Sequence, residues 1–253
     1  MLLLVLACRR EKNETSARQI DSLVQNEVEE ESAEQSDEIL KEEFFGSWKG
    51  GVQADPQTIE KVGVDNCFVA EEIDDSLFER MNDNSYKQGA PVNRADLRYL
   101  KILYHDFTGG ISKGEIVCNK KIASDLLEIF RKLYDEDYPL ESVRIIDEYG
   151  GDDLLSMQAN NTSCFNYRPT TGGSKLSKHA YGMAIDINPL YNPYVKLKTG
   201  KILPSGGEAY TDREKDFPYK INNKDIAYKE FTKRGYKWGG SWRTVKDYQH
   251  FEK

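Results

Sequence analysis

Residues 177–186 read Ser-Lys-His-Ala-Tyr-Gly-Met-Ala-Ile-Asp, and they lead directly into an alternating stretch. The alternation of side chains over residues 184–188 predicts a strand, which Pro189 ends. Successive side chains of a strand point to opposite faces, so Ile185 and Asp186 lie on opposite sides of it. A carboxylate flanked by core residues has to be paired or has to bind a metal. This stretch therefore directs attention to possible partners of Asp186.

Two histidines are the candidate partners. His179 lies seven residues before Asp186, across Gly182, whose missing side chain lets the chain turn back. A second segment, residues 247–252, reads Asp-Tyr-Gln-His-Phe-Glu and supplies His250. Two imidazoles and one carboxylate leave one position of a zinc ion open, which is typical of a catalytic rather than a structural zinc site. The spacing alone does not exclude the alternative, in which the two histidines are ordinary polar residues and the aspartate belongs to a turn.

Asp247 stands three residues before His250. A turn at this point would place its carboxylate beside the metal without coordinating it. A general base occupies such a position, where it takes a proton from the attacking water.

The pattern Ser-x-His-x-x-Gly-x-Ala-x-Asp, followed by Asp-x-x-His-Phe-Glu, resembles the D-alanyl-D-alanine carboxypeptidase family of zinc peptidases. Its relatives include the D,D-dipeptidases of vancomycin resistance and the L-alanyl-D-glutamate endopeptidases of phage lysins. The resemblance covers roughly residues 140–253. It implies an α+β fold of the hedgehog/D,D-peptidase type, in which a small antiparallel sheet is flanked by helices. It also implies that zinc is bound by His179, Asp186 and His250, with Asp247 as the base.

Residues 165–168 read Phe-Asn-Tyr-Arg and resemble the family segment whose arginine stabilises the developing oxyanion. A guanidinium suits this role because it is always charged and presents a planar fork of donors. The alternative for Arg168 is a structural salt bridge. Ser177 is expected either to orient a ligand or to cap a turn, and Glu252 either to support a ligand or to face solvent.

The resemblance implies a peptidase that acts on peptidoglycan stem peptides as a D-alanyl-D-alanine carboxypeptidase. The carboxypeptidases usually have Glu where this chain has Asp247. Together with Trp-Gly-Gly-Ser-Trp at residues 238–242, the aspartate favours the alternative of an L-alanyl-D-glutamate (L,D) endopeptidase. An alternative of another class is a non-catalytic cell-wall-binding module on the same fold.

Outside these motifs, helices and short strands mix without regular βαβ alternation, which favours α+β over α/β. Residues 46–100 are expected to form short helices and irregular structure. The other predicted strands are 115–117 and 143–147. The predicted helices are 120–134 with Asn119 as its cap, a short helix starting at Asp152 or Asp153, and 225–234 between Asp225 and Gly235.

The chain of 253 residues has a formal net charge of −8 and is long enough to bury a sizeable core. Residues 9–45 contain 5 basic and 12 acidic residues, so nearly all of the net charge lies there. This composition predicts an acidic flexible linker, partly helical at most, before a peptidase domain at residues 46–253. The acidic balance argues against a protein that coats nucleic acid, and we expect a monomer.

Residues 1–8 read Met-Leu-Leu-Leu-Val-Leu-Ala-Cys and resemble the end of a bacterial lipoprotein signal. In such proteins the cysteine, here Cys8, becomes the lipidated first residue. The segment departs from a typical signal because it lacks a basic region and its apolar run is short. An accidental apolar terminus is the alternative. The resemblance implies a membrane anchor and a place in the bacterial cell envelope, periplasmic or extracellular.

The other three cysteines are Cys67, Cys118 and Cys164, which allow at most one intramolecular disulfide beside a lipidated Cys8. Their spacing matches no thiolate metal site, and we expect buried free thiols. His105 matches no ligand position of the motif and is expected to be structural.

Overall fold

The computed structural model describes residues 35–171 and 173–253. The predicted lipoprotein segment with Cys8, and most of the predicted linker, lie outside these residues. The chain divides into two units between Ser47 and Trp48. Of the first unit, residues 35–47 are described, and residues 35–46 are helical. No helix in the described part of the chain is both long and apolar enough to cross a membrane.

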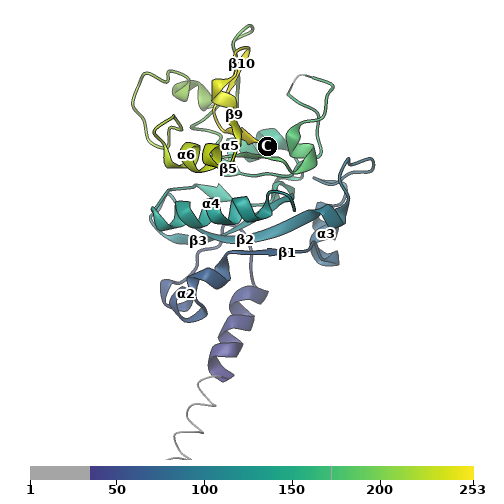
Figure 1. Cartoon of the computed structure of the whole chain (residues 1–253), viewed down its shortest axis with the longest axis vertical. Helices are drawn as coiled ribbons and strands as arrows, with labels where there is room; N and C mark the ends of the chain where they lie inside the picture. Colours follow the sequence, from purple (N-terminus) through teal and green to yellow (C-terminus); the bar gives the residue numbers. More distant parts are fainter. Residues whose placement is uncertain (1–34, 172) are drawn as a thin grey trace, which may run out of the picture. The chain divides into compact units, whose positions relative to one another are not determined.

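The second unit contains both helices and strands, as Figure 1 shows. Its α-helices are α2 (Pro56–Val62), α3 (Asp75–Met81), α4 (Ala123–Asp135), α5 (Asp153–Gln158) and α6 (Ile226–Lys233). Its strands are β1 (Val69–Glu71), β2 (Leu97–His105), β3 (Ile111–Asn119), β4 (Ser142–Val143), β5 (Asn161–Thr162), β6 (Ala184–Asp186), β7 (Tyr194–Lys196), β8 (Lys201–Leu203), β9 (Lys237–Trp238), β10 (Val245–Asp247) and β11 (His250–Glu252). Its 3₁₀ helices are Val64–Cys67, Arg94–Asp96, Ile146–Tyr149, Lys178–Tyr181, Gly207–Tyr210 and Gly239–Ser241.

The longest strands form an antiparallel sheet in the order β1-β2-β3. Helix α4 lies against this sheet, and the C-terminal part of the chain lies on the other side of α4 (Figure 1). The apolar positions of α4 recur at helical spacing and are buried between the two. The main core therefore includes residues of β2, β3, α4, β6, α6 and β11.

Three smaller sheets complete the unit. Strands β6, β11 and β9 form an antiparallel sheet in the order β6-β11-β9, and β10, β7 and β8 form another in the order β10-β7-β8. Strands β4 and β5 pair in parallel. The predicted α+β class is confirmed, although the chain contains several small antiparallel sheets where one was expected.

Most of the predicted elements are present with shifted ends. Residues 115–117 lie within β3, and the predicted strand 184–188 is shortened to β6. Asp152 caps α5, and Asp225 caps α6, each by accepting main-chain N–H groups of the first turn. Gly235 follows α6 with a φ of 85°, in agreement with its predicted role as a stop.

Two local predictions are wrong. Residues 143–147 do not form a strand, because β4 ends at Val143 and a 3₁₀ helix starts at Ile146. The helix predicted from residue 120 begins at Ala123. Asn119 does not cap it, because its side-chain oxygen accepts from Lys121 N (3.1 Å) and so caps the turn at residues 120–122 that precedes the helix. The Asn119 side chain also donates to the Tyr181 carbonyl (3.1 Å).

Cys67, Cys118 and Cys164 are free and buried, as the sequence indicated. Burial raises the pKa of the Cys67 thiol to about 11, so it stays protonated near neutral pH. The three thiols therefore contribute to the core as small apolar groups.

Gly182 and Gly150 provide a matched test of close packing. Each ends a 3₁₀ helix in the left-handed conformation, with a φ of 64°. A Cβ on Gly182 would lie 2.6 Å from the main-chain nitrogen of Asn119, whereas nothing lies within 4 Å of one on Gly150. Gly150→Ala should destabilise the protein by about 1–2 kcal/mol through its conformation alone. Gly182→Ala should lower the free energy of unfolding by ~1–3 kcal/mol more than Gly150→Ala does, because the added Cβ overlaps with β3.

Denaturant unfolding of both variants measures this difference. Equal midpoints for the two variants would contradict the close approach of Gly182 to β3.

Candidate metal centre and active site

His179, Asp186 and His250 converge at one point. Asp186 and His250 are directly opposite each other on the antiparallel strands β6 and β11. His250 Nδ1 lies 3.0 Å from Asp186 Oδ1, and His179 Nε2 lies 3.3 Å from Asp186 Oδ2. All three residues are buried, and their ligand atoms lie within 4.8 Å of one another. This group is able to hold a metal ion.

A short turn carries His179 to this point. Ser177 precedes the 3₁₀ helix Lys178–Tyr181, and its hydroxyl accepts a hydrogen bond from His179 N (3.3 Å). Gly182 ends the helix in the left-handed conformation and returns the chain to β6. Ser177 therefore caps the turn, and through the turn it holds the imidazole in place.

Hydrogen bonds on the outer side of each imidazole determine which nitrogen faces the centre. His179 Nδ1 lies 2.5 Å from the Cys164 carbonyl oxygen, which can only accept, so Nδ1 carries the proton. His250 Nε2 lies 3.4 Å from a carboxylate oxygen of Glu252, which accepts its proton in the same way. Glu252 therefore supports His250, which is one of the candidate ligands.

These assignments leave two nitrogen lone pairs and a carboxylate facing one another. His179 Nε2 and His250 Nδ1 are only 3.1 Å apart. Such an arrangement needs a positive charge between the groups, which a metal ion or an additional proton can supply. The donor set of two imidazoles and one carboxylate therefore fits a zinc ion that keeps an open position.

Electrostatics at the centre agree with this picture. Burial alone would raise the pKa of Asp186, but the charges and hydrogen bonds of His179 and His250 hold that pKa well below its usual range. Burial alone would lower the pKa of His250, yet hydrogen bonds to Asp186 and Glu252 raise it to about 10. The pocket thus favours a cation at this point.

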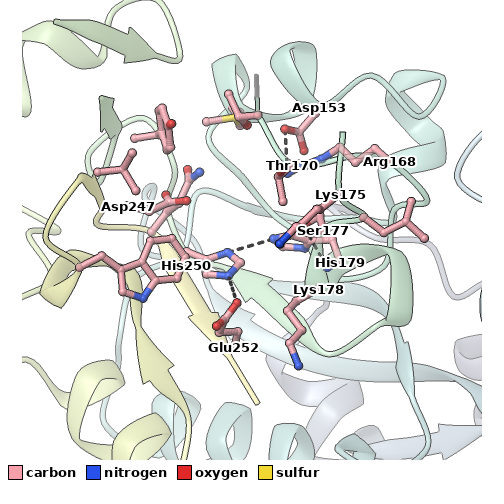
Figure 2. Close-up of a pocket in the computed structure, with 17 residues that line it drawn as sticks. Asp153, Arg168, Thr170, Lys175, Ser177, Lys178, His179, Asp247, His250 and Glu252 are labelled. Atoms are coloured by element: carbon pink, nitrogen blue, oxygen red, sulfur yellow. Dashed lines mark hydrogen bonds and ion pairs between the residues drawn. The ribbon is translucent and has the colours of Figure 1, made fainter. Parts of the chain in front are cut away.

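The centre borders a cavity of about 380 Å³, shown in Figure 2. Asp247 lines this cavity next to His250, and its Oδ1 is buried without a hydrogen-bond partner among the described residues. Burial raises the pKa of Asp247 to about 7, and the charge of Asp186 adds to the rise. The carboxylate is therefore free to accept a proton from a molecule in the cavity.

A glycine permits the close packing of Asp247 against the centre. Gly239 belongs to the stretch at residues 238–242. A Cβ there would lie 2.8 Å from the Asp247 Cβ and 3.3 Å from the His250 Cβ. Gly239 thus makes room for Asp247 and for His250.

Arg168 lines the opposite side of the same cavity (Figure 2). Its guanidinium forms an ion pair with Asp153 (2.9 Å) and donates to the Pro169 carbonyl (3.2 Å). Its Nε is buried without a hydrogen-bond partner in the described chain. The salt bridge that the sequence analysis gave as the alternative role of Arg168 is present. It holds the guanidinium at the edge of the cavity.

Sequence reasoning missed Asp153 as a residue of the site. Asp152 caps α5, so the neighbouring Asp153 is left free to pair with Arg168. The sequence signal that could have found it is the pair of adjacent aspartates at the start of a helix. Only one of them is needed as a cap, so the other is available for a different role. Burial raises the pKa of Asp153 as well.

The remaining polar and aromatic candidates divide between the cavity and the core. Trp242 lines the cavity, with its ring centroid 5.3 Å from that of His250. Trp238 packs against the core and donates to the Tyr248 carbonyl (2.8 Å). His105 lies away from the centre, paired with Asp137 at 3.2 Å, which agrees with a structural role.

A buried His-Asp-His group beside a free carboxylate is typical of a metal-dependent hydrolase. Residues 171–253 match the family model described as D-alanyl-D-alanine carboxypeptidase. The family predicted from the motifs is thereby confirmed for residues 171–253, which make up about a third of the chain. The matched stretch includes the three candidate ligands and Asp247, and Arg168 lies just before it. No curated protein and no solved structure matches the chain.

Metal content gives a direct test of the ligand set. His179→Ala and Asp186→Ala should each lose the bound metal, because either change removes a donor from the group. Glu252→Ala should weaken metal affinity by about 10–100-fold, since it frees the outer nitrogen of His250. Glu252→Gln should retain more affinity, because its amide oxygen still accepts that proton.

Elemental analysis and competition with a chelator measure these changes. Glu128→Gln is the control, because Glu128 makes only an exposed pair with Arg234. Full metal content in both His179→Ala and Asp186→Ala would disprove the assignment.

Proposed function

We propose that this protein is a zinc peptidase that hydrolyses peptide bonds in peptidoglycan stem peptides. The observation that carries the proposal is the convergence of His179, Asp186 and His250 beside a cavity that the carboxylate of Asp247 also lines. The family match over residues 171–253 supports a peptidase. The same match supports the hedgehog/D,D-peptidase type of fold for this part of the chain.

The three proposed ligands would hold zinc, which when bound lowers the pKa of a coordinated water and polarises the scissile carbonyl. Asp247 accepts a proton from the attacking water and later delivers it to the leaving amine. Its burial and its lack of another hydrogen-bond partner leave it available for both transfers.

Arg168 stabilises the negative charge that develops on the carbonyl oxygen. Its pairing with Asp153 fixes the guanidinium before the substrate arrives, so little reorganisation is needed during the reaction. Asp153 acts through Arg168 and is therefore a positioning residue.

The proposed bond is the D-alanyl-D-alanine bond, and an L-alanyl-D-glutamate endopeptidase is the second candidate because Asp stands at position 247. Digestion of purified muropeptides followed by mass spectrometry distinguishes them. A D,D-carboxypeptidase releases terminal D-alanine, whereas the endopeptidase cuts next to the glutamyl residue. Retention on cell walls without any product would instead indicate a non-catalytic binding module.

Asp247→Asn tests the proposed base. The amide keeps the shape of the side chain but cannot accept the proton, so turnover should fall by about 10²–10⁴-fold or more while zinc is retained. Steady-state kinetics and metal analysis on the same preparation measure both quantities. If zinc is lost together with activity, Asp247 is a ligand and one of the proposed ligands is misassigned.

Arg168→Lys provides the comparison. It keeps the charge but loses the planar fork, so it should also reduce turnover with zinc retained. The rate of this variant should still fall on the acidic side, where Asp247 becomes protonated. In Asp247→Asn that acidic decline should disappear. An acidic decline that persists in Asp247→Asn would assign it to another group.

We also propose that the protein is attached to the bacterial cell envelope through lipid on Cys8. The supporting feature is the stretch Val-Leu-Ala-Cys at residues 5–8. Cys8→Ser should release the protein from the membrane fraction of its native host, because the lipid acceptor is removed. Immunoblotting of fractions tests this, and unchanged fractionation would exclude the anchor without affecting the proposed enzyme.

A further inference from the structure

A second cavity adjoins the first. It measures about 650 Å³ and shares Leu176 and Lys178 with the cavity of the metal centre. Figure 2 shows the Lys178 side chain on the side of the imidazole pair away from Arg168. The two cavities therefore lie side by side and have part of their wall in common.

The wall of the second cavity comes from a part of the chain outside the family match. Val92, Asp96, Asn119 and Lys121 all line it. Residues 46–140 carry no recognisable motif, and this wall gives part of that segment a place beside the proposed active site.

The second cavity is fixed to the turn that carries His179. Asn119 N donates to the Gly182 carbonyl (2.9 Å), and the Asn119 side chain donates to the Tyr181 carbonyl (3.1 Å). Both carbonyls belong to the chain immediately after His179. These two hydrogen bonds tie the wall of the second cavity to the turn that carries His179.

The charge of the second cavity favours an anion. Lys121 and Lys178 line it, and Asp96 is its acidic residue. The Asp96 carboxylate is already paired with Lys120, at 2.6 Å. Lys178 donates to the main-chain oxygen of Lys253 (3.2 Å) and lies near Glu252, which itself accepts from His250. Among the residues that line the second cavity, the two lysines therefore outnumber the single carboxylate.

We propose that this second cavity is a substrate subsite that binds a free carboxylate of the stem peptide while the scissile bond lies at the metal centre. The inference rests on the proposed function, since the occupant is part of the same substrate. A glutamyl residue linked through one of its carboxyl groups keeps the other one free. Lys121 and Lys178 would bind that group by charge-assisted hydrogen bonds.

Two synthetic stem peptides that differ at one group test this proposal. In one the glutamyl carboxylate is free, and in the other it is amidated. The wild-type protein should cleave the free form with a kcat/KM about tenfold higher, the size expected from a hydrogen bond to a charged group. Lys121→Gln and Lys178→Gln should each bring this ratio close to one, through KM rather than kcat.

Lys61→Gln is the control, because Lys61 lies on α2 and lines neither cavity. It should keep the tenfold preference. Lys178 lies near Glu252, so Lys178→Gln could also change the metal content. In that case the result for Lys121→Gln decides whether the subsite exists. A preference that is absent in the wild type, or that persists in Lys121→Gln, overturns the subsite.

Failure of the proposed function gives a different result. If neither peptide is cleaved, the peptidase assignment is wrong, and calorimetric titration of the same two peptides then decides the inference. Tighter binding of the free form by the wild type, lost in Lys121→Gln, supports a carboxylate site. Equal binding, or none, overturns it.

Discussion

The pairing of β6 with β11 is the constraint on which the proposed site depends. In this register Asp186 faces His250, and Ile185 faces Phe251 one residue away. A shift by one residue would exchange the two faces of the strand, moving the carboxylate into the core and the isoleucine into the cavity. The core opposes such a shift, because Ile185 and Phe251 are fully buried and Phe251 stacks on Phe231 at 4.4 Å. The apolar packing of Ile185 and Phe251 thus fixes the positions of Asp186 and His250.

The same apolar packing explains how the molecule tolerates buried polar atoms that have no hydrogen-bond partner. Asp247 Oδ1, Arg168 Nε and Gln249 Oε1 are buried without hydrogen bonds in the described part of the chain. An unsatisfied buried polar atom costs about 1–3 kcal/mol, so such atoms are normally removed or paired. All three residues line one cavity. Water or substrate entering the cavity can satisfy them, and the stability of the surrounding core offsets their cost until then.

The sequence predicted those parts of the molecule that depend on local chemistry. The turn at Gly182, the strand around Asp186 and the caps at Asp152 and Asp225 each follow from a few neighbouring residues. The start of α4 was misplaced because a turn at residues 120–122, which Asn119 caps, separates this residue from the helix. The pairing of Asp153 with Arg168 and the wall formed by Lys121 depend on tertiary contacts. Spacing along the chain carries no signal for such contacts.

The two imidazoles differ in the kind of group that orients them. His179 is held by a main-chain carbonyl at residue 164, whereas His250 is held by the side chain of Glu252. Replacing the side chain at residue 164 leaves its carbonyl in place, so point mutation cannot directly delete the first contact. The contact between His250 and Glu252 can be strengthened, weakened or removed by a single substitution at residue 252. A substitution at position 252 can therefore adjust how tightly this centre would hold a metal ion, without a change in any of the three proposed ligands.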